Sequence, residues 1–275
     1  MVAKDFKLTT SDGKYLHGKS WEPDPVDAVV CLAHGLGEHI SRYDHLAHHF
    51  CKSGIAVYGT DQRGHGNNPG TRGHAKSHLV WDDLEALMKY ARMQHLDVPL
   101  FLYGHSWGGN IVANFLLRKS SDEIQGAVLS SPWLKLSFEP SQGQLLLAKL
   151  MSRIFPSLTQ ANGLEPDYLS RDPIIGQDYL KDPLVHNKIS AGLFNEAVKN
   201  GEYALENASG VSKPILIFHG TDDNITSIEA SKTFADASEL ITFRSWGDMR
   251  HETHNELGKE EVLDFTVNWI RSQLG

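Results

Sequence analysis

The sequence predicts a fold of the α/β class, in which helices cover both faces of a mostly parallel β-sheet. Short and almost wholly apolar runs recur along the chain, which is typical of strands buried on both faces of a sheet. Longer stretches with apolar side chains at helical spacing lie between these runs, and this alternation predicts parallel strands. With 275 residues, the chain is long enough for one such domain with an insertion.

The expected elements follow from these patterns in chain order. Residues 6–10 and 15–21 alternate weakly around a Ser-Asp-Gly-Lys turn, so they predict a hairpin. Buried strands are then expected at residues 28–33, 55–58 and 100–103, and further strands at residues 125–130, 214–218 and 240–246. Helices are expected after Ser41, which can cap the first of them, and at residues 81–94, 110–117 and 261–274.

The alternation stops between residues 134 and 212, where only helical stretches and loops are recognised. We therefore expect a core of residues 1–133 and 213–275, with residues 134–212 inserted above the sheet as a helical cap. Apolar side chains in residues 145–155 cover more than one helix face. Such a wide arc suits either ordinary packing or the wall of an apolar pocket. In the second case the substrate would contact Leu146, Leu150, Met151 and Ile154.

Composition excludes several classes of protein. The net charge is −8 without a basic block, which argues against a nucleic-acid partner. Two cysteines do not make a disulfide framework. Residues 1–7 lack the apolar core of a signal peptide, and no apolar run is long enough to span a membrane. The expected location is the cytoplasm.

The chemistry is predicted to centre on residues 99–109, which read PLFLYGHSWGG. An apolar strand, a Gly-x-Ser-x-Gly turn and a helical stretch follow one another there, which is the context of a nucleophile elbow. The flanking glycines permit a tight turn that raises the hydroxyl of Ser106 above the end of the sheet. Ser106 is therefore the candidate nucleophile.

A serine nucleophile needs a base, and the base needs an acid that orients it. Asp222 and Asp223 follow a late strand, and we favour Asp223 because it can fold back over the sheet edge. His251 and His254 follow the last strand, and we favour His251 because it is nearer to that strand. Asp222 and His254 remain the alternatives.

Acyl transfer also requires two N–H donors for the negative charge that develops on the carbonyl oxygen. Trp107, directly after the nucleophile, supplies one backbone N–H, and Leu36 in the His-Gly-Leu-Gly loop is the expected second donor. Histidine pairs at i, i+4 spacing occur without a His-Glu-x-x-His motif, so we expect no metal site.

With these pieces in order, the chain resembles the monoacylglycerol lipase and lysophospholipase branch of the α/β-hydrolases. The resemblance rests on HGLGEHISRYDHLA (34–47), DQRGHG (61–66), GHSWGG (104–109), HGTDDNIT (219–226) and RHETHNE (250–256), and on YLSRDP (168–173) and DPLVH (182–186) in the expected cap. It implies an eight-stranded sheet, a triad of Ser106, Asp223 and His251, and oxyanion donors at Leu36 and Trp107. It also implies hydrolysis of a single-chain acyl ester such as monoacylglycerol, without a metal or another cofactor. A small-molecule lipid ester is then the expected partner.

Several alternatives stay open at this point. A lysophospholipase or a general carboxylesterase would use the same triad. A serine aminopeptidase of the same fold, whose relatives also carry tryptophan after the nucleophile, would need acidic cap residues such as Glu165, Asp167 or Glu196 facing the substrate amine. A catalytically dead binding protein is the alternative from another class. Transient contact of the cap with a membrane surface and the oligomeric state are also open.

Overall fold

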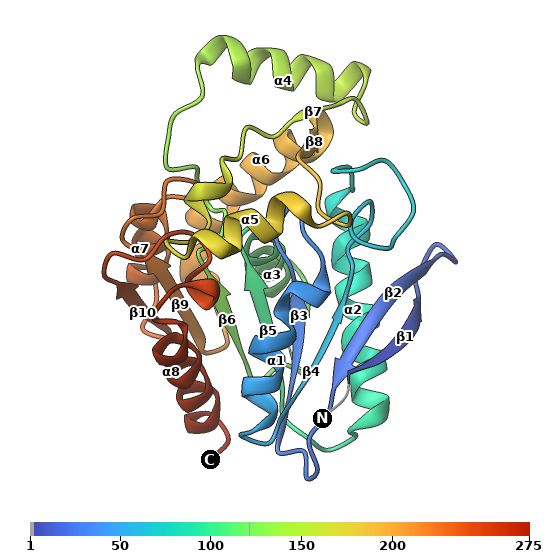
Figure 1. The fold of residues 1–275 in the computed structure, drawn as a ribbon, viewed down its shortest axis with the longest axis vertical. Coiled ribbons are helices and arrows are strands. Elements are labelled where there is room, and N and C mark those ends of the chain that lie inside the picture. The colour runs from blue at the N-terminus through green and yellow to red at the C-terminus, as the bar shows by residue number, and fades with distance from the viewer. Residues whose placement is uncertain (1–2, 121) are drawn as a thin grey trace.

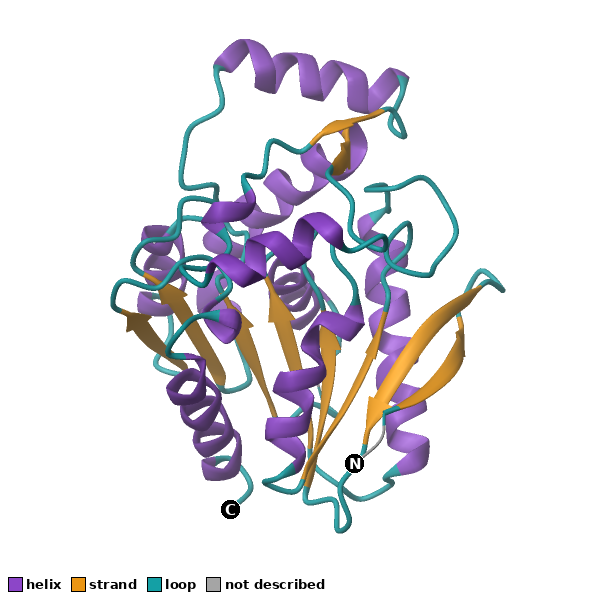
Figure 2. Cartoon of the chain, in the orientation of Figure 1, coloured by secondary structure: helices purple, strands orange, loops and turns teal. Residues whose placement is uncertain are grey.

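The computed structural model describes residues 3–120 and 122–275. Its centre is an eight-stranded sheet in the order β1-β2-β4-β3-β5-β6-β9-β10 (Figures 1 and 2). The strands are β1 (Lys4–Thr9), β2 (Tyr15–Trp21), β3 (Ala28–Ala33), β4 (Ile55–Thr60), β5 (Leu100–His105), β6 (Gly126–Ser130), β9 (Ile215–Gly220) and β10 (Ile241–Trp246). β1 with β2 and β2 with β4 pair antiparallel, and the remaining pairs are parallel. The predicted α/β fold with a mostly parallel sheet is therefore confirmed.

Helices cover both faces of this sheet (Figure 1). The helices of the sheet layers are α1 (Asp44–Cys51), α2 (Ser77–Gln94), α3 (Trp107–Arg118), α6 (Ala191–Asn207), α7 (Ile228–Asp236) and α8 (Lys259–Ser272). Apolar side chains of α1 and α8 form the core on one face, and those of α2, α3, α6 and α7 form it on the other. Every residue of β3, β4 and β5 is buried, which explains why these runs are almost wholly apolar. None of the described helices has the length and apolar character needed to cross a membrane.

The entry into α1 differs from the prediction. A short 3₁₀ helix, Ile40–Tyr43, precedes α1, so Ser41 is not at the position that caps it. The Ser41 hydroxyl instead accepts a hydrogen bond from Lys19 Nζ at 3.2 Å. The prediction that Ser41 caps this helix is wrong, because a turn of tighter helix comes first.

The segment of residues 134–212 contains α4 (Gln142–Ile154), α5 (Pro173–Lys181) and α6. It also contains two short antiparallel strands, β7 (Thr159–Ala161) and β8 (Lys188–Ser190), so the expectation of helices and loops alone was wrong. α4 lies beyond the carboxyl ends of the parallel strands, at the opposite end of the molecule from both termini (Figure 1). α6 lies against α3, whose Asn114 amide donates to the carbonyl of Asn200 at 2.9 Å. The assignment of the whole segment to one cap stays a prediction.

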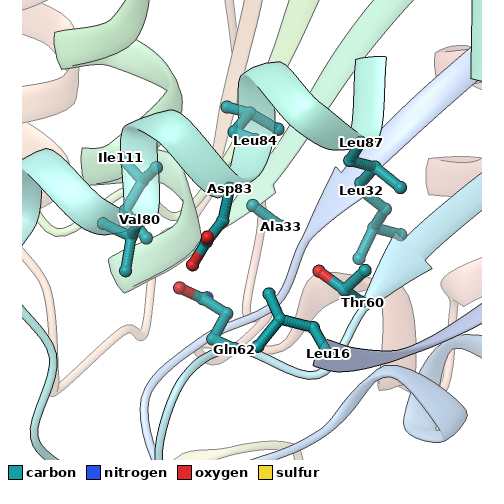
Figure 3. A pocket seen from close by; sticks show the side chains of 10 residues that line it. All are labelled: Leu16, Leu32, Ala33, Thr60, Gln62, Val80, Asp83, Leu84, Leu87 and Ile111. Carbon is teal, nitrogen blue, oxygen red and sulfur yellow. The ribbon is translucent and has the colours of Figure 1, made fainter. Parts of the chain in front are cut away.

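A small cavity of about 20 Å³ lies under α2, between that helix and the first strands. Figure 3 shows that the side chains of Asp83 and Gln62 extend toward one another from opposite sides of it. Asp83 also receives two hydrogen bonds from Arg63, at 2.6 and 2.7 Å. The cavity has room for about one water molecule, so it is part of the packing rather than a substrate site.

Candidate active site

Ser106 lies between the end of β5 and the first turn of α3, in a backbone conformation that L-residues rarely adopt. Its φ is 54° and its ψ is −116°. A Cβ on Gly104 would collide with the carbonyl of Gly108, so the turn requires a glycine there. A non-glycine residue in such a conformation costs about 1–3 kcal/mol, and it persists only where the surroundings hold it.

Neighbouring backbone groups hold this turn in place. The amide of Ser106 donates to the carbonyl of Ser130 at the end of β6, at 3.0 Å. The carbonyl of Ser106 accepts from the amides of Asn110 and Trp133, at 3.1 and 2.8 Å. The nucleophile candidate is therefore fixed by hydrogen bonds to α3 and to the segment after β6.

Asp223 and His251 are brought together by the loops after β9 and β10. His251 Nδ1 lies 2.7 Å from Asp223 Oδ2. Asp223 Oδ1 accepts from the amides of Ile225 and Thr226, at 2.7 and 3.0 Å, and Oδ2 accepts from the Thr226 hydroxyl at 2.9 Å. A carboxylate can only accept these bonds, so Nδ1 of His251 must carry the proton and Nε2 is left as the basic atom.

The electrostatics of this pair suit a general base. Burial alone would lower the pKa of His251, but the charge and hydrogen bond of Asp223 outweigh it and raise that pKa above the usual value. Burial would raise the pKa of Asp223, but His251 and a hydrogen bond from His219 hold it well below the usual value. His219 Nε2 lies 2.9 Å from Asp223 Oδ2. Sequence reasoning missed this second histidine, although it immediately precedes the glycine that ends β9.

The alternatives to these two residues lie elsewhere. Asp222 is exposed, and its carboxylate accepts a long bond, 3.4 Å, from the Thr221 hydroxyl. His254 is buried and its ring stacks on Tyr43, with the ring centroids 5.0 Å apart. Burial lowers the pKa of His254 to about 3. Neither residue forms the acid–base contact that Asp223 and His251 form.

The loop that carries Leu36 lies against the nucleophile turn. A Cβ built on Gly35 would be 3.3 Å from the Cβ of Ser106, and Leu36 lines the same cavity as Ser106. The amide of Gly35 donates to Glu38 Oε1 at 2.6 Å, which fixes the loop. Trp107 is the first residue of α3, where backbone N–H groups lack partners within the helix. The two predicted oxyanion donors thus lie on the two segments that border Ser106.

A cavity of about 650 Å³ opens at Ser106 and His251 and extends to α4 and α6. Most of its wall is apolar, with the large side chains of Trp133, Leu136, Phe138, Met151, Phe194 and Ile225 among the lining residues. A smaller polar part of the wall contains Glu38, Arg42, Tyr179 and Glu252. These four belong together, because Arg42 binds both carboxylates and lies over the Tyr179 ring.

Of the cap residues predicted to contact substrate, only Met151 lines this cavity, together with Leu147 and Ala148 of α4. Leu146, Leu150 and Ile154 are 69%, 52% and 55% exposed and are not among the lining residues. They recur every four residues and so share one helix face, which is turned away from the cavity. The apolar arc of the sequence is wide enough for both faces, so it could not indicate which face is turned inward. Within residues 3–120 and 122–275, no group of three or more His, Cys, Asp or Glu side chains is arranged to hold a metal ion.

A sheet of this topology, with a strained serine at the strand–helix turn and an Asp–His pair at the same edge, defines a serine hydrolase of the α/β-hydrolase fold. The family model described as "Serine aminopeptidase, S33" matches residues 24–258. The chain belongs to this family, and within it the chain is a monoacylglycerol lipase-like serine hydrolase.

Individual relatives support this assignment. The chain is 34% identical to the monoacylglycerol lipase of Mycolicibacterium smegmatis, over 92% of both chains. The solved structure of the monoacylglycerol lipase of Paleococcus ferrophilus superposes with a TM-score of 0.85 at 34% identity, over 94% of this chain and 99% of the other. An uncharacterised abhydrolase domain-containing protein of Dictyostelium discoideum is 36% identical over this whole chain, which spans only 30% of that protein.

Proposed function

We propose that this chain is a serine esterase that hydrolyses the acyl ester of monoacylglycerol, or of a similar single-chain lipid, to a fatty acid and an alcohol. The observation that carries the proposal is the 650 Å³ cavity, because its mostly apolar wall reaches Ser106 and His251. This volume falls in the usual range for small-molecule sites. The apolar part suits an acyl chain, and the polar part around Arg42 and Tyr179 suits the hydroxyl groups of glycerol.

The proposed reaction has two steps. His251 Nε2 takes the proton of Ser106, whose Oγ attacks the ester carbonyl. The N–H groups of Leu36 and Trp107 stabilise the oxyanion, and His251 returns the proton to the departing alcohol. A water molecule, activated by the same histidine, then releases the fatty acid from the acyl-serine. Asp223 holds the tautomer of His251 and stabilises its imidazolium form.

A serine aminopeptidase is less well supported. None of Glu165, Asp167 and Glu196 is among the residues lining the cavity, and Glu196 instead accepts a hydrogen bond from the amide of Ser77 at 2.6 Å. Glu38 and Glu252 do line it, but both are bound to Arg42. Among the described residues that line the cavity, both glutamates are therefore already bound to a guanidinium rather than free to bind a substrate amine.

The test is a substrate panel with the purified protein: monoacylglycerols, lysophosphatidylcholine, simple esters and aminoacyl amides, each with varied acyl length. We expect the highest kcat/KM on monoacylglycerols. Preference for lysophosphatidylcholine would assign a lysophospholipase, and preference for aminoacyl amides would contradict the proposal. The cytoplasmic location, the lack of a nucleic-acid partner and cap contact with membranes are part of the same proposal, and cell fractionation and vesicle co-sedimentation test them.

A further inference from the structure

A series of buried hydrogen bonds connects two loops. One is the loop after β3 that carries Leu36, called the oxyanion loop below, and the other is the loop after β10 that carries His251, called the histidine loop. Glu252, directly after His251, accepts from Arg42 Nη1 and Nη2 at 2.7 and 2.8 Å. Arg42 Nη1 also donates to Glu38 Oε2 at 2.6 Å. Glu38 Oε1 in turn accepts from the amide of Gly35, which precedes the oxyanion donor Leu36. The route from Gly35 to His251 thus passes through three charged side chains.

These side chains are fixed on every side. Glu252 Oε2 also accepts from the side-chain amide of Asn255 at 2.7 Å, and Glu38 Oε1 accepts from the Tyr43 hydroxyl at 2.7 Å. The side chains of Glu38 and Glu252 are each only 3% exposed. A bidentate guanidinium–carboxylate pair of this kind fixes both distance and angle. This network therefore links the two loops directly, in addition to the backbone bonds that the amides of His251 and Glu252 make to the carbonyls of Tyr168 and Leu169.

The network of Glu38, Arg42 and Glu252 has a net charge of −1, because two carboxylates share one guanidinium. Titratable groups face Glu252 from several elements. They are Glu38 from the oxyanion loop, Arg42 and Tyr43 from the 3₁₀ helix, His45 from α1, His105 from β5, Tyr179 from α5, and His251 and His254 from its own loop, with Asp223 behind His251. Burial holds the pKa values of His105 and His254 far below the usual value, so these two rings stay neutral at neutral pH. His251 is the group on which a positive charge develops during the reaction.

We propose that Glu252 is a positioning residue for the hydrolysis: through Arg42 and Glu38 it holds the histidine loop and the oxyanion loop in one geometry, and its charge favours the imidazolium form of His251. This inference rests on the proposed function, since it assigns His251 and Leu36 their roles. Glu252 does not contact the reacting atoms, but it helps to fix the positions of His251 and Leu36.

The test compares Glu252→Gln with Asp83→Asn in the full chain. Asp83 is a matched control, because Arg63 binds it with two hydrogen bonds and also binds Asp12, so one guanidinium again serves two carboxylates. None of these three residues lines the cavity that contains Ser106. The substrate is p-nitrophenyl butyrate, which lacks glycerol, so its KM does not depend on glycerol contacts. The measured quantities are kcat, KM, the Tm and the acid limb of kcat/KM against pH.

We expect Glu252→Gln to lower kcat at least tenfold with KM within about twofold, since a catalytic group displaced by a fraction of an ångström costs about that much. We also expect the acid limb to move to lower pH, because removing a negative charge favours the neutral, active form of His251. Asp83→Asn should lower the Tm while kcat and the acid limb stay as in the unmodified chain. A purely structural role for Glu252 would instead make the two variants behave alike.

An unchanged kcat and acid limb in Glu252→Gln, or the same changes in Asp83→Asn, would overturn the inference. If Glu252→Gln does not fold, Glu252→Asp decides, because it keeps the charge but is too short to hold both nitrogens of Arg42. That variant should lose kcat while its acid limb stays in place, and an undiminished kcat would refute the positioning role. Failure of the proposed function looks different, because it appears in the unmodified chain: that chain would prefer aminoacyl amides in the substrate panel or would hydrolyse no ester.

Discussion

Acyl-chain selectivity should depend on the inner face of α4, and Met151→Ser tests this. Met151 lines the cavity, whereas Leu150, its neighbour in sequence, is 52% exposed and is not among the lining residues. Leu150→Ser is therefore a matched control that makes a comparable apolar-to-polar change on the outer face of the same helix.

The magnitude follows from apolar burial. Each methylene of an acyl chain that enters the cavity gains about 0.8 kcal/mol, which is roughly a fourfold rise in kcat/KM if the gain persists in the transition state. Met151→Ser removes an apolar contact from the cavity wall. For a long acyl chain this should raise the activation free energy by about 1 kcal/mol, which lowers kcat/KM roughly fivefold. A butyryl chain, which ends near Ser106, should lose less than about twofold.

The assay measures kcat/KM for monoacylglycerols and p-nitrophenyl esters from acetyl to dodecanoyl in the three proteins. We expect a rising profile that levels off when the cavity is full, a flatter profile for Met151→Ser, and an unchanged one for Leu150→Ser. Equal effects of the two variants would show that the inner face of α4 does not contact the chain. If kcat/KM of the unmodified protein did not change with acyl length, the proposal that it hydrolyses single-chain lipid esters would be refuted.

Three further predictions concern the catalytic pair and its loop. Asp223→Asn and His251→Ala should each lower turnover about 10⁴-fold, whereas Asp222→Asn and His254→Ala should cost far less, and steady-state kinetics that reverse either ranking would refute that assignment. Because Asp223 raises the pKa of His251, kcat/KM should rise with pH through a midpoint above the usual histidine value, and Asp223→Asn should move the residual acid limb to lower pH. Glu256→Ala, which removes the acceptor of the Arg171 and Arg250 amides, should lower the free energy of unfolding by about 2 kcal/mol, and an unchanged midpoint in calorimetry would contradict this.

The sequence predicted those parts of the site that depend on local pattern. The strand, the glycine-flanked turn and the helix around Ser106 follow one another within residues 100–118, so their geometry depends on the local sequence. Asp223 and His251 could be predicted because the carboxyl ends of neighbouring parallel strands meet at one edge. Their loops follow β9 and β10, which pair directly in the sheet.

Features that depend on packing between distant segments could not be predicted. Glu252 and Arg42 are 210 residues apart, and nothing in the chain near either residue indicates its partner. The orientation of α4 is likewise set by what lies beneath it, so an apolar arc around most of the helix could not identify Met151 against Leu150. β7 and β8 have three residues each, which is too short for an alternating pattern to be recognised.

The central claim is that Ser106 is the nucleophile that forms the acyl-enzyme, and the most direct measurement is covalent labelling. A fluorophosphonate reacts with an activated serine, and peptide mass spectrometry locates the adduct. We predict one adduct per chain, on the peptide that contains Ser106, with loss of both labelling and monoacylglycerol hydrolysis in a folded Ser106→Ala variant. Labelling of Ser106→Ala at the rate of the unmodified protein, or an adduct on another residue, would contradict the account.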